Sequence, residues 1–413
     1  MAAATGHQRF MDVTVVVIFS LVYLGLILGE LPGLALDRTG IALLGAIALV
    51  VTEKLSLAEA WGAVDVPTIC LLFGLMVVSA QFRLGGFYSA VTRALADRAV
   101  GPSALLAWLV VVSGALSAVL ANDIVCLAMA PVLAEGCARR GLNPIPFLLA
   151  LACAANVGSA ATLIGNPQNM LIGQALSLSF VGYLRQAVVP AVLGLGVVWG
   201  VLAWLYRHDW LRQSRLVSVD APSFDAWQTG KGVVVTVLVV AAFVFTAWPR
   251  ELVALGAAAV ILLSRRTASR DFLGLVDWEL LVLFVGLFVV NAALADSGAL
   301  EAVMLRVREA GLALEQPAQL FAVTVVLSNL VSNVPAVMLL LPVATHPLAG
   351  ATLALASTLA GNLLIVGSIA NIIVVDAARR LGVEIDWRTH ARAGVPITVG
   401  TLWLAAVWLW GQT

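Results

Sequence analysis

Long apolar runs recur along the whole chain, and most of them are long enough to cross a membrane. A spanning helix needs about 20 mostly apolar residues. Each run that meets or approaches this length is predicted to form one spanning helix. These runs are 13–29, 33–52, 66–82, 186–206, 232–248, 250–264, 279–295 and 394–410.

Two further apolar segments are interrupted near their centres. The segment 145–178 contains Gly-Asn-Pro-Gln-Asn at 165–169, and the segment 350–378 contains Gly-Ser-Ile-Ala-Asn at 367–371. Glycine and proline favour breaks in a helix. Each segment is therefore predicted to form one spanning helix with an unwound centre, which brings the expected number of spanning helices to about ten.

Two more apolar stretches, 103–134 and 317–345, carry polar clusters at mid-length. The first contains Ala-Asn-Asp at 121–123, and the second contains Ser-Asn-Val-Pro at 332–335. An unpaired polar group that faces lipid at this depth costs several kcal/mol. We therefore predict two re-entrant helical hairpins with tips buried in protein. The alternative is a straight helix that is kinked at a polar contact.

Polar residues and glycines recur in the same order in two halves of the chain. The pairs Asp65–Asp277 and Gly86–Gly298 have the same separation, Asn122–Asn333 has nearly the same one, and Gly165–Gly367 and Asn169–Asn371 share a slightly shorter one. Each half contains five predicted spans and one hairpin, and an odd number of spans reverses the polarity of the second copy. We predict two inverted repeats, 12–206 and 232–411, joined by a cytoplasmic linker, 207–231.

The composition supports a membrane protein and excludes several soluble classes. Hydrophobic residues make up 62% of the chain and charged residues 11%, and 23 basic side chains balance 23 acidic ones. A soluble domain is about half apolar and a quarter charged. Without a net positive charge, the chain also lacks the field that attracts nucleic acid. The expected fold class is an all-α polytopic membrane protein that contacts lipid and binds no nucleic acid.

Basic residues in the loops predict the orientation, because cytoplasmic loops are richer in Lys and Arg. With both termini outside, all but six of the 23 basic residues fall in the cytoplasm. The sequence thus predicts a multi-pass protein of the bacterial inner membrane with both termini outside. The six exceptions are Arg9, Lys54, Arg185, Arg250, Arg306 and Arg308.

The predicted tips and unwound loops contain amides, hydroxyls and a single carboxylate. Inverted repeats with matching unwound segments are typical of secondary transporters, which bind substrate near the midplane. Backbone carbonyls at Gly165 and Gly367 suit Na⁺, and Asp123 suits Na⁺ or H⁺, so these three are the candidate ion-coupling residues. The candidate substrate-binding residues are Asn122, Asn166, Asn169, Ser332, Asn333, Ser368 and Asn371.

An intramembrane hydrolase is the contrasting interpretation of Ser, Asn and Asp at membrane depth. The sequence has no GxSxG or HExxH motif and no CxxC pair. Its histidines, including His390, are expected near helix ends or in loops. We therefore expect neither an enzyme nor a resident metal or cofactor, with bound Na⁺ as the one candidate ligand besides the substrate.

The four polar blocks, in this order, resemble the ion transporter superfamily. They are 121–123, 165–169, 332–335 and 361–371, and the resemblance extends from about residue 12 to 411. The superfamily includes arsenite efflux permeases, divalent anion/sodium symporters, citrate–metal transporters and sodium/proton antiporters of the NhaD type. The resemblance implies a substrate held between two hairpin tips and two unwound loops.

The tip triplets bear on the substrate that this resemblance implies. Divalent anion symporters carry Ser-Asn-Thr at each tip, whereas this chain has Ala-Asn-Asp at 121–123 and Ser-Asn-Val at 332–334. A fixed carboxylate repels an anion, and the Ala-Asn-Asp form is more similar to arsenite permeases, whose substrate is mostly neutral As(OH)₃. The chain is closest to anion permeases that resemble the membrane protein of arsenical pumps.

The resemblance favours an H⁺- or Na⁺-coupled transporter of a small oxyanion or related solute, with arsenite or antimonite efflux as the specific case. One alternative is a Na⁺/H⁺ antiporter that uses Asp123, and another is Na⁺-coupled uptake of a carboxylate or an inorganic anion. The sequence leaves open whether the protein forms a homodimer. The chain has no Walker A motif, so any use of ATP, as in an arsenite pump, would need a separate ATPase subunit.

Overall fold

The computed structural model describes residues 12–29, 33, 35–211 and 222–412, and these residues fold into helices. One isolated bridge, between Leu142 and Leu211, is the only β pairing among them. The first ten helices are α1 (Val13–Leu28), α2 (Arg38–Val51), α3 (Leu57–Gly62), α4 (Val66–Leu84), α5 (Phe87–Ala96), α6 (Pro102–Val119), α7 (Asn122–Arg139), α8 (Pro144–Ser159), α9 (Pro167–Ala175) and α10 (Phe180–Leu205).

The second half of the chain repeats this order of helices, so that α1 matches α11 and α10 matches α20. Two short 3₁₀ turns, η1 (Leu341–Val343) and η2 (Ile365–Gly367), are additional. The helices are α11 (Ala226–Phe245), α12 (Arg250–Leu262), α13 (Ser269–Leu273), α14 (Trp278–Asp296), α15 (Ala299–Glu309), α16 (Pro317–Val331), α17 (Asn333–Leu340), α18 (Ala349–Ala360), α19 (Ile369–Arg380) and α20 (Trp387–Trp410).

The structure confirms the all-helical class expected from the sequence. Among the described residues, six helices are long and apolar enough to cross a membrane, namely α4, α6, α10, α11, α14 and α20. Other predicted spans, such as those at α1 and α2, form shorter apolar helices. The number of ten spans and the inverted polarity of the two halves stay predictions.

Matching helices begin with the same local chemistry. Asp65 caps α4 by accepting a hydrogen bond from the backbone of Thr68, and Asp277 caps α14 by accepting one from Leu280. A capping side chain satisfies a backbone N–H that has no partner within the helix. The glycines that precede α5 and α15 both have positive φ angles, 66° and 72°, which favour glycine. The repeat is therefore present in local structure as well as in sequence.

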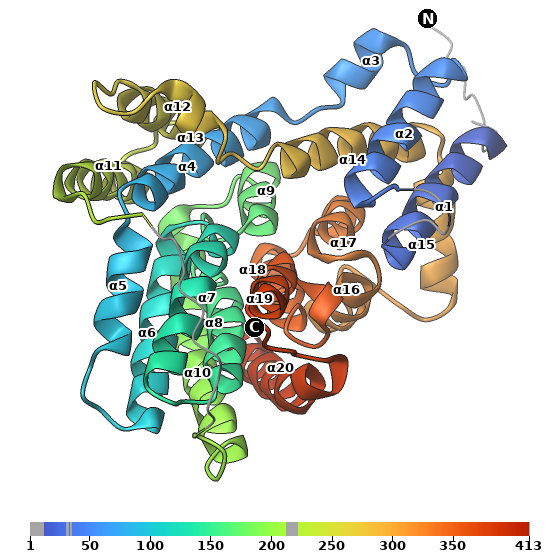
Figure 1. The fold of residues 1–413 in the computed structure, drawn as a ribbon. Coiled ribbons are helices and arrows are strands. Elements are labelled where there is room, and N and C mark those ends of the chain that lie inside the picture. The colour runs from blue at the N-terminus through green and yellow to red at the C-terminus, as the bar shows by residue number, and fades with distance from the viewer. Residues whose placement is uncertain (1–11, 30–32, 34, 212–221, 413) are drawn as a thin grey trace, which may run out of the picture.

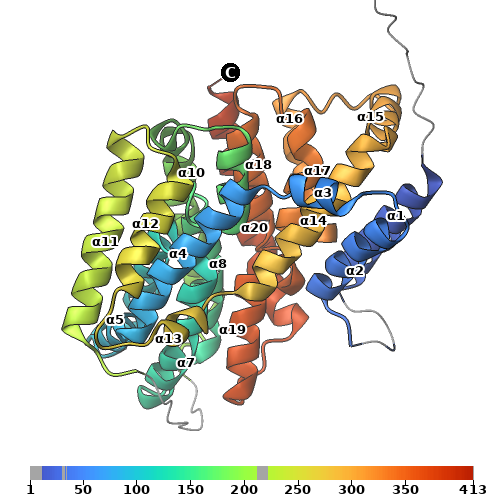
Figure 2. The same cartoon turned by 90° about the horizontal axis from the view of Figure 1, so that it is seen from above.

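The two halves interlock through matched close contacts. A Cβ atom on Gly74 of α4 would lie 2.6 Å from the carbonyl group of Ala254 in α12, and one on Gly286 of α14 would lie 2.8 Å from the carbonyl carbon of Ala42 in α2. The two glycines occupy equivalent positions in the repeat, and so do the two alanines. Helices α4 and α14 therefore each pack against helices of the opposite half. Helices α11 and α12 lie beside α4, and helices α1 and α2 lie beside α14 (Figure 2).

The predicted hairpins and broken helices are present as helix pairs. Residues 120–121 join α6 to α7, and Ser332 alone separates α16 from α17. These helices and the broken helices α8–α9 and α18–α19 occupy one part of the molecule, while α1–α4 and α11–α14 form a layer along its other side (Figure 1). This arrangement brings the tips and the unwound segments together beneath α4 and α14.

The breaks lie earlier in the chain than predicted. They span residues 160–166 and 361–368, whereas the sequence centred them at 165–169 and 367–371. Asn166 explains the first shift, because its side chain accepts a hydrogen bond from the backbone N–H of Asn169 and so starts α9 at Pro167.

The predicted linker, 207–231, is also shorter than expected. Asp225 caps α11 by accepting hydrogen bonds from Trp227 and Gln228, so that residues 226–231 already belong to the helix. Within the linker, residues 212–221 lie outside the described part of the chain.

The interlock predicts that Gly74→Ala and Gly286→Ala each destabilise the protein, because the added methyl group meets the backbone of another helix. Overpacking of this kind costs about 1–3 kcal/mol. We expect a lower midpoint of thermal unfolding in detergent for both variants. Gly256→Ala is the matched control, since Gly256 lies in α12 with nothing within 4 Å of its Cβ position. An equal effect of all three substitutions would contradict the interlock.

Candidate functional site

Asn156 of α8 joins the first hairpin tip to the second unwound segment. Its Oδ1 accepts hydrogen bonds from Asn122 Nδ2 at 3.2 Å and from Ser368 Oγ at 2.9 Å. Its Nδ2 donates to the side-chain oxygens of Asn362 at 2.8 Å and Asn371 at 3.2 Å. All five side chains are buried. Three of the predicted site residues, Asn122, Ser368 and Asn371, therefore meet at one asparagine.

Thr358 of α18 has the matching role for the first unwound segment. It is the repeat equivalent of Asn156, in the same register that relates Asn169 to Asn371. Its hydroxyl oxygen accepts hydrogen bonds from Asn166 Nδ2 at 3.3 Å and Gln168 Nε2 at 3.1 Å, and it lies 3.5 Å from Asn169 Oδ1. Each half thus supplies one polar side chain that binds the unwound segment of the other half.

The unwound backbone is satisfied by asparagines at matching positions. Asn169 Nδ2 donates to the carbonyl of Thr162 at 2.9 Å, and Asn371 Nδ2 donates to the carbonyls of Gly361 at 2.8 Å and Leu364 at 3.1 Å. Free carbonyls at this depth would be costly without such partners. Asn169 and Asn371 are therefore structural partners of the breaks, whatever further role they have in binding.

The two glycines predicted to supply carbonyls lie at the breaks, close to other backbone atoms. The carbonyl of Gly165 accepts a hydrogen bond from the backbone N–H of Asn122 at 3.2 Å. A Cβ on Gly165 would lie 2.3 Å from the carbonyl oxygen of Ser159, and one on Gly367 would lie 3.1 Å from that of Gly361. A side chain at Gly165 would separate the first tip from its unwound segment.

Buried oxygens without a hydrogen-bond partner gather at both tips. At the first tip these are Ser117 Oγ and Asn122 Oδ1, and at the second they are Ser328 Oγ, Asn329 Oδ1 and Asn333 Oδ1. Ser117 matches Ser328 in the repeat, in the register that also matches Asn122 with Asn333. A buried acceptor without a partner is unfavourable. These oxygens therefore suit a cation or the hydroxyl groups of a solute.

The second tip has a strained connection and faces a cavity. Ser332 has a φ angle of 77°, which is unusual for a residue other than glycine. A cavity of about 560 Å³ reaches this tip and lies between the start of α14 and the segment η2–α19. Its charged lining residues are Asp37, Arg38, Asp277 and Glu279, so carboxylates outnumber the guanidinium group.

Asp123 lies in the first turn of α7 and is partly buried. Asp277 caps α14 and lines the cavity at the second tip. The sequence marked Asp277 only as a member of the repeat.

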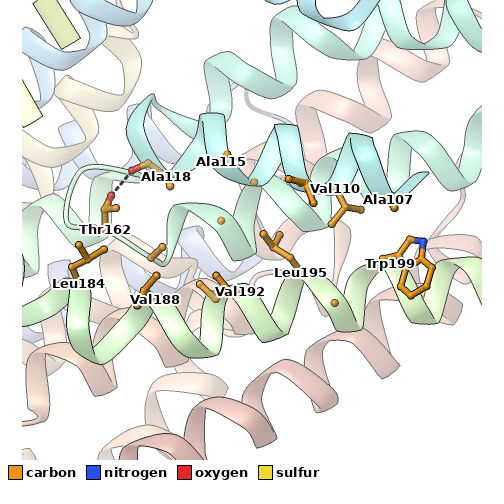
Figure 3. A pocket seen from close by; sticks show the side chains of 16 residues that line it. Ala107, Val110, Ala115, Ala118, Thr162, Leu184, Val188, Val192, Leu195 and Trp199 are labelled. Carbon is orange, nitrogen blue, oxygen red and sulfur yellow. Dashed lines mark hydrogen bonds between the residues drawn. The ribbon is translucent and has the colours of Figure 1, made fainter. Parts of the chain in front are cut away.

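A second cavity of about 560 Å³ lies among α6, α8 and α10 and is lined almost wholly by apolar side chains (Figure 3). Thr162 contributes a hydroxyl group to it, and this group donates to the carbonyl of Ala118. The cavity offers no charged side chain to a polar solute. The tips and the unwound segments remain the candidate site.

Sequence reasoning missed four residues of this region, namely Asn156, Thr358, Asp277 and His390. The histidine lies near a helix end, as expected, in the first turn of α20, but it is buried there with Nε2 3.1 Å from the carbonyl oxygen of Asn362. An available signal for Asn156 and Thr358 was their shared register in the repeat, which pairs two polar side chains in apolar helices.

The hydrogen bonds of Asn156 predict that Asn156→Leu destabilises the protein strongly. The substitution leaves several buried polar groups without partners, at about 1–3 kcal/mol for each group. We expect a large fall in the midpoint of thermal unfolding and a smaller fall for Thr358→Val. Thr236→Val is the control, because the hydroxyl of Thr236 is already buried without a partner. The prediction fails if Thr236→Val is as damaging as Asn156→Leu.

Comparison with known proteins places this geometry among transporters. A family model described as a citrate transporter matches residues 15–360. The uncharacterized transporter Rv2685 of Mycobacterium tuberculosis is 31% identical over 370 residues, which cover 84% of this chain and 86% of that protein. The silicon efflux transporter LSI3 of Oryza sativa subsp. japonica is 29% identical over 463 residues, which cover 93% and 94%.

A solved structure has the same overall fold. The crystal structure of the Alcanivorax borkumensis YdaH transporter matches with a TM-score of 0.60 and 17% identity, over 96% of this chain and 98% of that one. The resemblance stated from the four polar blocks is thereby confirmed at the level of the family.

Proposed function

Since this chain belongs to the citrate transporter family, and is therefore a membrane transporter and not an enzyme, we propose that it is a secondary active transporter of a small oxyanion or related solute. Transport is coupled to Na⁺ or H⁺. The specific case that we propose is efflux of arsenite or antimonite as the neutral hydroxide, with the solute held between the two hairpin tips.

The unpaired tip oxygens are the observation on which this proposal depends. Asn122 Oδ1 and Asn333 Oδ1 are acceptors, and an acceptor stabilises a cation or a hydroxyl donor but repels a deprotonated oxygen. A neutral hydroxide such as As(OH)₃ offers three hydroxyl donors. Its oxygens can in turn face the N-termini of α7 and α17, where backbone N–H groups point outward.

The charge of the cavity supports the same class of solute. Its lining contains the carboxylates of Asp37, Asp277 and Glu279 and the single guanidinium group of Arg38. An excess of carboxylates repels an anion and leaves the approach of a neutral molecule unaffected. The relative from Oryza sativa, named as a silicon efflux transporter, agrees with the export of an inorganic solute.

The coupling ion is proposed to bind beside the tips. Ser117 Oγ and Asn122 Oδ1 at the first tip lie near Gly165, whose Cβ position is 2.8 Å from the carbonyl of Ser117. Oxygen ligands from unwound backbone and from helix C-termini suit Na⁺ in transporters, and α6 ends here. Ser328, Asn329 and Gly367 form the matching set at the second tip.

A Na⁺/H⁺ antiporter is the second candidate, favoured by the place of the Asp123 carboxyl group in the first turn of α7, next to Asn122 at the first tip. A carboxyl group at this place can bind Na⁺ or exchange a proton. In this case a pH gradient drives Na⁺ flux through the purified protein without any other solute. The proposed transporter instead requires arsenite or antimonite for its ion flux.

The tip site predicts that Asn122→Ala and Asn333→Ala each reduce arsenite transport by at least tenfold in proteoliposomes. Each substitution removes an acceptor that faces the solute or its coupling ion, so transport falls much more than stability. The measurement is arsenite flux under a Na⁺ or a pH gradient, with citrate as a comparison solute. Two variants with wild-type flux would overturn the two-tip site, and flux of citrate alone would favour the uptake of a carboxylate.

The coupling role of Asp123 predicts a selective defect in Asp123→Asn. The amide keeps the size of the side chain and its position in the first turn of α7, but it cannot release a proton or carry a charge. We expect gradient-driven transport to be lost, while exchange of solute across the membrane is retained. Asp97→Asn, at the end of α5, is the control and should keep both activities. Full gradient-driven transport by Asp123→Asn would leave this carboxylate with a structural role only.

A further inference from the structure

Two arginines occupy matching places at the starts of α2 and α12. Arg38 is the first residue of α2, and Arg250 is the first residue of α12. Their separation along the chain equals that between Ala42 and Ala254. Ala42 and Ala254 make the matched contacts with α14 and α4. The two guanidinium groups therefore start from equivalent backbone positions in the two halves.

Arg250 ties its helix to the end of α9. Its guanidinium nitrogen Nη2 donates to the carbonyl of Gly173 at 3.2 Å and to the carbonyl of Leu178 at 2.6 Å. Beside it, Glu251 accepts a hydrogen bond from Gln174 Nε2 at 2.9 Å. On this side α4 and α9 are in direct contact. The broken helix of the first half is thus held against the layer that contains α4 and α12.

Arg38 makes no such contact. It lines the cavity at the second tip, and its Nε is buried without a hydrogen-bond partner. The cavity lies between α14 and the segment η2–α19. In the first half of the chain, α14 is matched by α4, and the segment η2–α19 is matched by the unwound segment together with α9. Carbonyls equivalent to those that bind Arg250 belong to the last turn of α19, at residues 375–380. Among the described residues, no hydrogen bond links Arg38 to this turn.

We infer that Arg38 and Arg250 are a pair of gating residues that close the two sides of the transporter in turn. In the present state, Arg250 holds α9 and the cavity on the side of Arg38 is open. In the alternate state, α19 moves against α14, Arg38 donates to the carbonyls of residues 375–380, and Arg250 releases α9. This inference rests on the proposed secondary transport, which requires two such states.

The physical basis is that a cation near the C-terminus of a helix is stabilised by unpaired carbonyls and by the helix dipole. Each guanidinium group makes these charge-assisted hydrogen bonds in one state only. An interaction present in one state shifts the equilibrium toward that state. Removal of either arginine should therefore change the balance of states, and the two removals should act in opposite directions.

A thiol reporter in the cavity tests this inference. Ile372 of α19 lines the cavity and is 39% exposed. Ile372→Cys is introduced into a Cys70→Ser background, since the other three natural cysteines are buried. The protein is purified in lipid nanodiscs, and the measurement is the rate of reaction with N-ethylmaleimide. The reagent is uncharged, so loss of an arginine does not change its attraction to the site.

We expect Arg250→Ala to slow the reaction about tenfold, because two charge-assisted hydrogen bonds of the open-cavity state are lost. Arg38→Ala should leave the rate unchanged or raise it. The double variant lacks both interactions and should return to within about twofold of the parent. Arg250→Gln keeps an amide donor and should slow the reaction less than Arg250→Ala. It also serves as the test variant if the alanine variant does not fold.

Arg306→Ala is the control for loss of one positive charge, since Arg306 is exposed and pairs with Glu309. Its rate should equal that of the parent. An unchanged or faster reaction in the folded Arg250 variant would overturn the inference, as would a double variant that is as slow as Arg250→Ala. The reaction needs neither substrate nor gradient. Failure of arsenite transport by the wild-type protein would therefore reject the proposed substrate without affecting this result.

Discussion

A polar group inside the membrane must find its partner within the protein, because lipid tails offer none. The unwound segments at 160–166 and 361–368 expose backbone carbonyls, and asparagines from the following helices pair with them. Asn156 and Thr358 then bind the unwound segment of the opposite half. The same pairing that makes two broken helices tolerable in lipid also fixes how the halves meet, and it leaves oxygens at both tips available for a ligand.

The sequence was sufficient to predict the helical class and the helix breaks at both tips and in both interrupted segments, while the inverted repeat and the number of spans stay predictions. These features depend on local patterns: apolar runs of spanning length, polar clusters at mid-depth, and glycine or proline at a break. Boundaries were less accurate. The break before α9 ends at Asn166 because that side chain caps the helix, and the linker ends at Asp225 for the same reason. Side-chain capping depends on a few atoms, which hydropathy does not register.

The sequence predicted which residues belong to the candidate site better than it predicted the contacts between them. Asn122, Ser368 and Asn371 were named from the repeat, but their meeting at Asn156 depends on packing between helices of different halves of the chain. His390 and Asp277 were missed because each lies at the edge of an apolar run, where charged and polar residues usually face water. The burial of His390 and the place of Asp277 in the cavity lining follow from how the helices pack, and no pattern within one helix contains that information.

The close contacts of Gly74 and Gly286 bear on how such a protein is made. Ala254, the partner of Gly74, belongs to the second half of the chain, so α4 emerges from the ribosome long before its groove can be filled. The first half alone would leave that backbone surface bare, unless another copy of the chain covered it. Because Ala42 of α2 is equivalent to Ala254, a first half made alone carries both surfaces of this contact, and two such copies could pair with each other in the same way.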